Sequence, residues 1–215
     1  MGALLDNLPK LLEGFLRTLE LTALAALGAL VIGTLLAAMR VSPVPSLRFA
    51  GAAYVNTVRN TPLVLVFAFV FFGLPRLEIR FSFFEFAVLA LSVYTAAFVC
   101  EAIRSGVNAI PPGQAEAARA VGMTFGQTLR TVVLPQAFRT VVPPLGNILI
   151  ALTKNTAIAE AFAVTEATAV FDGLVRDRPD AIYALFFGVA LGYVVIVLAI
   201  SAVFRIIERR VVVLR

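Results

Sequence analysis

The 215-residue sequence contains no histidine, no tryptophan and a single cysteine, Cys100. It therefore lacks the side chains for an internal disulfide, a Cys/His zinc site, haem ligation by histidine or a histidine general base. The phosphate-binding pattern GxxxxGK[ST] is missing too, so ATP hydrolysis by the usual phosphate-cradling route is excluded. No nucleophile–base pair or metal-ligand cluster is visible. The sequence predicts neither an enzyme nor a resident cofactor.

Charged residues are also scarce. They make up 14% of the chain, whereas 60% of the residues are hydrophobic, a composition that few soluble domains sustain. Apolar segments of about 20 residues recur, each long enough to cross a bilayer. The first has no basic region before it and no small-residue cleavage site after it, so we expect a retained span and no signal peptide. The net charge of +5 needs no nucleic acid as partner.

The apolar pattern predicts an all-α integral membrane protein of five transmembrane helices, forming a single domain over residues 1–215. The second span is expected to be broken at Asn60-Thr61-Pro62, and the fourth to carry Pro143-Pro144 near its start. The expected spans are 15–39, 49–59 with 63–74, 84–105, 138–153 and 182–207.

Between the third and fourth spans lies a polar, basic loop, residues 111–135. Pro111 and Pro112 suit a helix start, because a proline in the first turn loses no intrahelical hydrogen bond. Glu116 is expected in the early turns, where a carboxylate meets the positive end of the helix dipole. Gly122 can close this helix in a left-handed cap.

A second short helix is predicted after that glycine. Thr124 and Gln127 have the spacing of a capping box, and the helix should run through Val133 before Pro135 ends it. The loop is therefore expected to form a compact pair of short helices, which we call the knuckle, standing in water between two spans.

The distribution of Lys and Arg predicts the orientation. With the knuckle in the cytoplasm, the N-terminus lies outside and the C-terminus inside. Six basic residues then lie outside and Lys154 lies near a span edge. The other eleven of the 18 are cytoplasmic: Arg40, Arg48, Arg59, Arg104, Arg119, Arg130, Arg139, Arg205, Arg209, Arg210 and Arg215.

The knuckle also carries a family resemblance. Glu116-Ala117-Ala118, then Gly122, Val132 and Leu134-Pro135 at fixed spacing, resembles the EAA loop of bacterial ABC importer permeases. The family pattern usually has isoleucine where Val132 stands. The resemblance implies that this loop is the coupling helix, which docks into a cleft on a cytoplasmic ATPase. The implied ATPase-coupling residues are Glu116, Ala117, Ala118, Gly122, Leu134 and Pro135.

Further stretches narrow the resemblance to polar amino acid permeases, most like the glutamate permeases of actinobacteria. They are residues 54–63, Gly113-Gln114, residues 134–137, and residues 145–147 with 152–156. The resemblance implies a multi-pass protein of the cell membrane. Its implied partners are nucleotide-binding ATPase subunits that bind the ATP, an extracytoplasmic substrate-binding protein and a second permease subunit. A homologous heterodimer is favoured, and a homodimer stays open.

Polar residues in or beside the spans are candidates for the substrate pathway, because each is costly in lipid. Asn147, Ala151 and Lys154 are spaced i, i+4 and i+7, so they are expected on one helix face. Lys154 offers a cation, and Asn147 and Asn155 offer amide donors, to a carboxylate substrate. Alternatively, Lys154 extends to the interface or pairs with Glu160.

Arg59 and Thr61, at the break in the second span, could present further donors, as discontinuous helices do in transporters. Glu101 and Arg104 are i, i+3 neighbours that should neutralise one another. An ion-coupled secondary transporter remains an alternative, although Glu101 is its only clear coupling carboxylate. Glutamate, glutamine and other polar amino acids all remain open as substrates.

Overall fold

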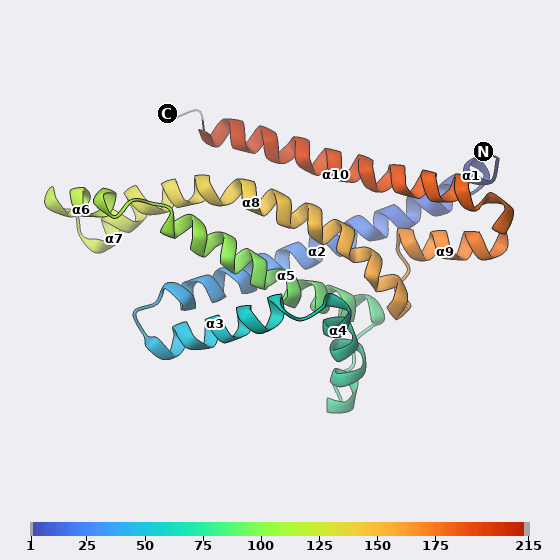
Figure 1. Ribbon diagram of the computed structural model, residues 1–215, viewed down its shortest axis with the longest axis horizontal. Coiled ribbons are helices and arrows are strands. Elements are labelled where there is room, and N and C mark those ends of the chain that lie inside the picture. Colours follow the sequence, from blue (N-terminus) through green and yellow to red (C-terminus); the bar gives the residue numbers. More distant parts are fainter. Residues whose placement is uncertain (1, 213–215) are drawn as a thin grey trace.

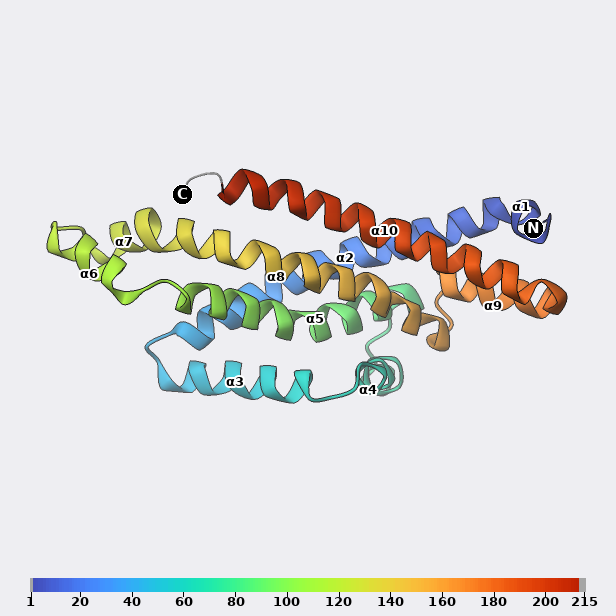
Figure 2. The ribbon, with the colours of Figure 1, turned by 45° about the horizontal axis from the view of Figure 1, so that its top comes forward.

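The computed structural model describes residues 2–212 as a bundle of long helices that run along one common direction (Figures 1 and 2). No strand occurs in that part of the chain, and Arg215 lies outside it. The α-helices are α1 (Gly2–Asp6), α2 (Leu8–Val41), α3 (Pro45–Arg59), α4 (Leu63–Ala68), α5 (Phe83–Asn108), α6 (Pro112–Ala120), α7 (Phe125–Thr128), α8 (Leu134–Asn155), α9 (Ala167–Asp177) and α10 (Ile182–Val212). Shorter turns are the π-helical η1 (Phe69–Gly73) and η3 (Leu129–Val133) and the 3-10 turns η2 (Leu74–Leu77), η4 (Thr156–Phe162) and η5 (Pro179–Ala181).

Three of the described helices are long and apolar enough to cross a membrane by themselves: Leu8–Val41, Phe83–Asn108 and Pro179–Arg210. Two further pairs qualify only when each bent pair is taken as one span. Pro45–Arg59 with Leu63–Leu77 bends by 108°, and Phe125–Phe162 with Ala167–Asp177 bends by 50°. The described residues thus contain three spans, or up to five, and the all-helical fold class is confirmed.

The second span differs from a straight helix. Its first half begins at Pro45, four residues before the expected start, and the break at Asn60-Thr61-Pro62 lies where it was expected. Pro62 takes an extended conformation with φ −56° and ψ 136°, which starts α4 in a new direction. Because the pair bends by 108°, the apolar part of this segment turns away from the axis of α3 (Figure 1).

The prolines of the fourth span do not act as expected. The helix does not end at Pro135, because α8 begins at Leu134 and includes Pro135 near its start. The π-helical turn η3 joins α7 to α8 without a break. α8 starts at Leu134, four residues before the predicted residue 138. Pro143 and Pro144 lie inside it, and the helix continues although both residues lack an N–H donor.

The core is built where α2 packs along α5. Leu21, Ala25 and Leu91 are completely buried in it, together with Phe67 of α4. A Cβ on Gly33 would lie 2.6 Å from Cβ of Val99, so the two helices approach at a distance that only glycine permits. Small residues at such positions allow close packing of neighbouring helices.

The two ends of the bundle differ in content. The α2–α3 turn, the knuckle helices α6 and α7, and the C-terminal end of α10 lie together at one end (Figures 1 and 2). The N-terminus and α9 lie at the other end. The loop that sequence reasoning placed in the cytoplasm is thus at the same end as the basic C-terminal turn of α10, which carries Arg209 and Arg210.

We predict that Gly33→Ala destabilises the α2–α5 contact. The added methyl would meet Cβ of Val99 at 2.6 Å and the carbonyl oxygen of Ala96 at 2.8 Å, and such overpacking costs about 1–3 kcal/mol. Thermal unfolding in detergent measures the loss, with a thiol-reactive dye that reports exposure of the buried Cys100.

Gly173→Ala in α9 is the matched control, because a Cβ there meets nothing within 4 Å. It should unfold at the temperature of the parent protein or slightly above, since alanine favours helix. Equal unfolding temperatures for Gly33→Ala and the parent would contradict the close-contact interpretation.

Candidate functional site

The first helix of the knuckle ends in a Schellman motif. Gly122 has φ +88°, the left-handed conformation that was predicted for it. Its N–H donates to the Arg119 carbonyl at 3.0 Å, and the N–H of Met123 donates to the Ala118 carbonyl at 3.1 Å. Together the two bonds close α6. Because a Cβ on Gly122 would meet nothing within 4 Å, glycine is required there by backbone conformation and not by space.

The second helix begins with the predicted capping box. The Gln127 N–H donates to Oγ1 of Thr124 at 3.3 Å, and the Thr124 N–H donates to Oε1 of Gln127 at 2.9 Å. This reciprocal pair fixes the direction in which α7 leaves Met123. α7 itself has only four residues, and η3 then carries the chain into α8. The knuckle is a defined turn of two helices, held by backbone and cap hydrogen bonds.

The residues that resemble the EAA loop lie on different sides of this turn. Glu116 and Ala117 are exposed, whereas Ala118 is buried against the rest of the loop. Glu116 stands in the second turn of α6, within the early turns where it was expected, but beyond the first turn, where the helix dipole acts most strongly. Leu134 and Pro135 are exposed at the start of α8.

Sequence reasoning missed the apolar tip of the knuckle. Val121 and Phe125 flank Gly122 and are 80% and 74% exposed. Large apolar side chains exposed together at the tip of this turn form a candidate contact surface. The available signal was that large apolar residues stand directly beside the predicted helix break at Gly122.

A groove of about 350 Å³ runs between α5 and α8. Two of the predicted pathway residues, Asn147 and Asn155, line it, and Ala151 lies between them on the same wall. The small side chain of Ala151 leaves the space open between the two amides. α5 forms the facing wall, and the full lining is Tyr94, Thr95, Phe98, Asn147, Ile148, Ala151, Leu152 and Asn155.

Two other pathway candidates lie away from that lining. Lys154 is exposed on a neighbouring face of α8, so the expected stripe of positions 147, 151 and 154 is instead 147, 151 and 155. No ion pair between Lys154 and Glu160 is formed within residues 2–212. The Thr61 hydroxyl donates to the Thr57 carbonyl at 2.8 Å, within its own turn.

Arg59 lies beside the groove. Its guanidinium carbon is 5.5 Å from the centre of the Phe98 ring, and Phe98 is one of the lining residues. This distance is within the range of a cation–π contact. The position at the last residue of α3 places the cation at the helix break, as sequence reasoning expected.

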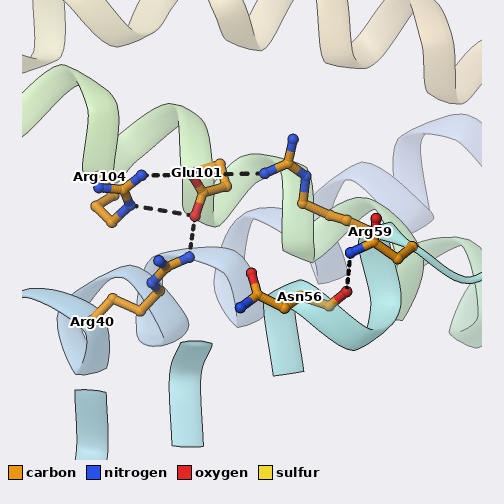
Figure 3. A network of polar contacts seen from close by, with 6 residues as sticks. Arg40, Asn56, Arg59, Glu101 and Arg104 are labelled. Atoms are coloured by element: carbon orange, nitrogen blue, oxygen red, sulfur yellow. Dashed lines mark hydrogen bonds and ion pairs between the residues drawn. The ribbon is translucent and has the colours of Figure 1, made fainter. Parts of the chain in front are cut away.

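Arg59 also belongs to a cluster of charges around Glu101 (Figure 3). Arg104 forms the predicted pair, with its Nη2 2.8 Å from Oε2 of Glu101. Arg40, at the end of α2, donates to the other carboxylate oxygen. The Arg59 Nη1 atom is 3.7 Å from Oε2. The sequence predicted one cation for this carboxylate, and the structure brings three of them to it.

A second buried carboxylate, Glu166, is fully hydrogen-bonded. It caps α9 by accepting from the N–H groups of Thr168 at 2.7 Å and Ala169 at 3.0 Å. The Tyr193 hydroxyl of α10 donates to it at 2.8 Å, and the Thr18 hydroxyl of α2 at 3.2 Å. Glu166 therefore joins three helices at the end of the bundle opposite the knuckle. Within residues 2–212, no group of three or more His, Cys, Asp or Glu side chains could hold a metal ion.

Comparison with known proteins identifies relatives of the whole chain. The 45% identical glutamate transport system permease protein GluC of Corynebacterium glutamicum aligns over 202 residues, which cover 88% of this chain and 89% of that protein. The probable glutamine ABC transporter permease protein GlnM of Bacillus subtilis is 36% identical over 210 residues, 98% of this chain and 97% of that protein.

A solved structure shares the fold as well. The crystal structure of an amino acid ABC transporter with histidines contains a chain that matches with a TM-score of 0.89 and 30% identity, covering 96% of each chain. The model of one family, described as the binding-protein-dependent transport system inner membrane component, matches residues 29–213. The chain therefore belongs to this family of inner membrane transport components.

Proposed function

We propose that this chain is the permease subunit of an ATP-driven importer of polar amino acids, with glutamate as the favoured substrate. The observation that carries the proposal is the knuckle, a capped pair of helices that stands at one end of the bundle with an apolar tip. The relatives named for glutamate and glutamine transport support the substrate class. Glutamate is favoured because the 45% identical relative carries its name.

The knuckle suits contact with a separate ATPase. Val121 and Phe125 offer an apolar contact surface, and Glu116 and Arg119 offer charges beside it, all of them exposed. The Schellman motif and the capping box hold the turn in one shape, so force applied to the tip is passed to α5 and α8 and not absorbed by a flexible loop. ATP is bound by that partner subunit, and the coupling residues are those of the EAA-like loop.

The proposed topology has five spans, with each bent pair counted as one span, the N-terminus outside and the C-terminus inside. It is supported by the grouping of the knuckle, the α2–α3 turn and the basic end of α10 at one end (Figure 1). An extracytoplasmic binding protein would then deliver substrate at the end that carries α9.

The groove between α5 and α8 is the proposed substrate path. Its two amides and the Thr95 hydroxyl supply hydrogen bonds, and Arg59 supplies a cation beside it. One chain leaves the groove open along its side, so a second permease subunit is required to enclose the substrate. We favour a homologous partner over an identical one. Lys154 and Thr61 remain candidates for the mouth of the path.

Two substitutions in the knuckle should abolish the coupling of transport to ATP hydrolysis. Glu116→Lys and Gly122→Val are expected to abolish ATP-driven uptake while the protein still inserts, the first through an opposite charge at the contact surface and the second through strain at φ +88°. Uptake into proteoliposomes and co-purification of the ATPase subunit measure the two effects.

Asp172→Lys is the control, since it makes the same charge reversal in α9 at the far end of the bundle. It should leave co-purification of the ATPase unchanged. Normal ATP-driven uptake in both knuckle variants would refute the coupling role.

Filling the groove should block translocation without affecting assembly. Ala151→Leu adds bulk between Asn147 and Asn155 on the lining wall, so uptake should fall at least tenfold while the ATPase still co-purifies. Ala199→Leu makes the same change on α10 at an exposed position and should leave uptake intact. If both variants transport equally well, the substrate does not pass between α5 and α8.

A further inference from the structure

The charge cluster around Glu101 contains more cations than its carboxylate can neutralise. Arg40, Arg59 and Arg104 surround a single Glu101, and these arginines come from the ends of α2 and α3 and from α5 itself (Figure 3). Charged groups that are partly shielded from water are costly unless they are paired. The excess positive charge therefore favours binding of an additional anion.

The three arginines are not held equally. Arg104 donates from Nε to one oxygen of Glu101 at 3.3 Å and from Nη2 to the other at 2.8 Å, and Arg40 donates to the first oxygen as well. Arg59 lies 3.7 Å away, beyond hydrogen-bonding distance. Among the described residues its guanidinium donates no hydrogen bond, and its side chain is 43% exposed, against 17% for Arg40 and 32% for Arg104. Arg59 is thus the cation with donors to spare.

The same arginine also lies against a residue of the groove wall, although it is not itself a lining residue. Its guanidinium lies over the ring of Phe98, whose side chain lines the wall that faces Asn147 and Ala151. The cation therefore lies close both to the Glu101 carboxylate and to the Phe98 ring of the groove wall. A small displacement of the flexible side chain would carry its donors from Glu101 to a ligand in the groove.

We propose that Arg59 exchanges partners, leaving Glu101 to bind a carboxylate group of the transported amino acid. The inference rests on the proposed function, because it assigns a ligand to the groove of that function. A guanidinium binds a carboxylate with two parallel hydrogen bonds, a better arrangement than the long contact with Glu101. Glu101 keeps Arg40 and Arg104 when Arg59 leaves, so the exchange strands no buried negative charge.

The exchange has a mechanical consequence. Arg59 is the last residue of α3, and Glu101 lies on α5, the helix that leads directly toward the knuckle. Release of the Arg59–Glu101 contact removes one charge contact between the end of α3 and α5 when substrate is present, while the Tyr54 hydroxyl still donates to the Val93 carbonyl at 2.8 Å. The presence of substrate is thereby communicated to the helix that the ATPase moves.

The test is direct binding of radiolabelled ligands to the purified permease–ATPase complex, without the binding protein. Three probes are compared: glutamate, glutamine, which lacks the side-chain carboxylate, and isoglutamine, which lacks the α-carboxylate. Arg59 binds one of the two carboxylates of glutamate, and one of the two analogues lacks that carboxylate. In the parent complex this analogue should bind about 10- to 100-fold more weakly than glutamate, because it loses one charge-assisted hydrogen-bonded pair.

Arg59→Gln should weaken glutamate binding by a similar factor and should abolish the discrimination against that one analogue. Which analogue loses its disadvantage identifies the carboxylate that Arg59 binds. Arg104→Gln is the matched control, because it removes the same charge from the same cluster, and it should keep the discrimination. If Arg59→Gln still discriminates against both analogues as the parent does, the proposal is overturned.

Glu101→Gln tests the competition itself. It should leave glutamate binding unchanged or several-fold tighter, because the rival carboxylate is gone, whereas a merely structural role predicts weaker binding. If Glu101→Gln does not fold, the comparison of Arg59→Gln with Arg104→Gln decides alone. A parent complex that binds no amino acid would count against the proposed function, while normal parent binding with an unaffected Arg59→Gln would refute only the exchange.

Discussion

Every backbone N–H and C=O group at membrane depth must find its partner within the protein, and this constraint explains where the chain is regular and where it is not. Long helices satisfy it by themselves, as α2, α5 and α10 do over 34, 26 and 31 residues. Each break must instead be closed by a specific device. The buried cap at Glu166 is such a device. The Schellman motif at Gly122 and the capping box at Thr124 close the helix ends of the exposed knuckle, outside the spans, in a similar way.

Two carboxylates show how the same constraint treats charge. Glu166 is completely buried, yet each of its oxygens accepts hydrogen bonds, two from backbone N–H groups and two from hydroxyls. It therefore serves to fix α2, α9 and α10 together at one end. Glu101 is instead surrounded by three arginines, so the cluster as a whole carries a net positive charge. The first is a closed network, and the second has capacity for another anion.

The sequence predicted the features that depend on neighbours along the chain. The left-handed Gly122, the capping box of Thr124 and Gln127, and the break at Asn60-Thr61-Pro62 are all confirmed, because backbone sterics and side-chain caps within a few residues determine them. The error at Pro135 has a local cause as well. A π-helical turn precedes it, and the usual helical period does not reveal such a turn.

Features that depend on how helices pack could not be predicted in the same way. Helical spacing brings 147, 151 and 154 close to one face, yet the position of α5 decides that 155 lines the groove in place of 154. Arg40 reaches Glu101 across 61 residues of sequence, a contact that only the parallel packing of α2 along α5 creates. The exposure of Val121 and Phe125 follows from their position, because both lie in the knuckle, outside every predicted span.

These observations connect the two ends of the proposed mechanism through one helix. α5 carries Phe98 in the groove, Glu101 in the charge cluster and, at its end, the link to the knuckle. Its tight packing along α2, set by the glycine contact at Gly33, allows it to move only together with its neighbour as a rigid unit. Communication between two sites requires an element with two arrangements that both sites can bias. Arg59 supplies that element, because it stands at the end of α3, within reach of both the groove and the carboxylate on α5.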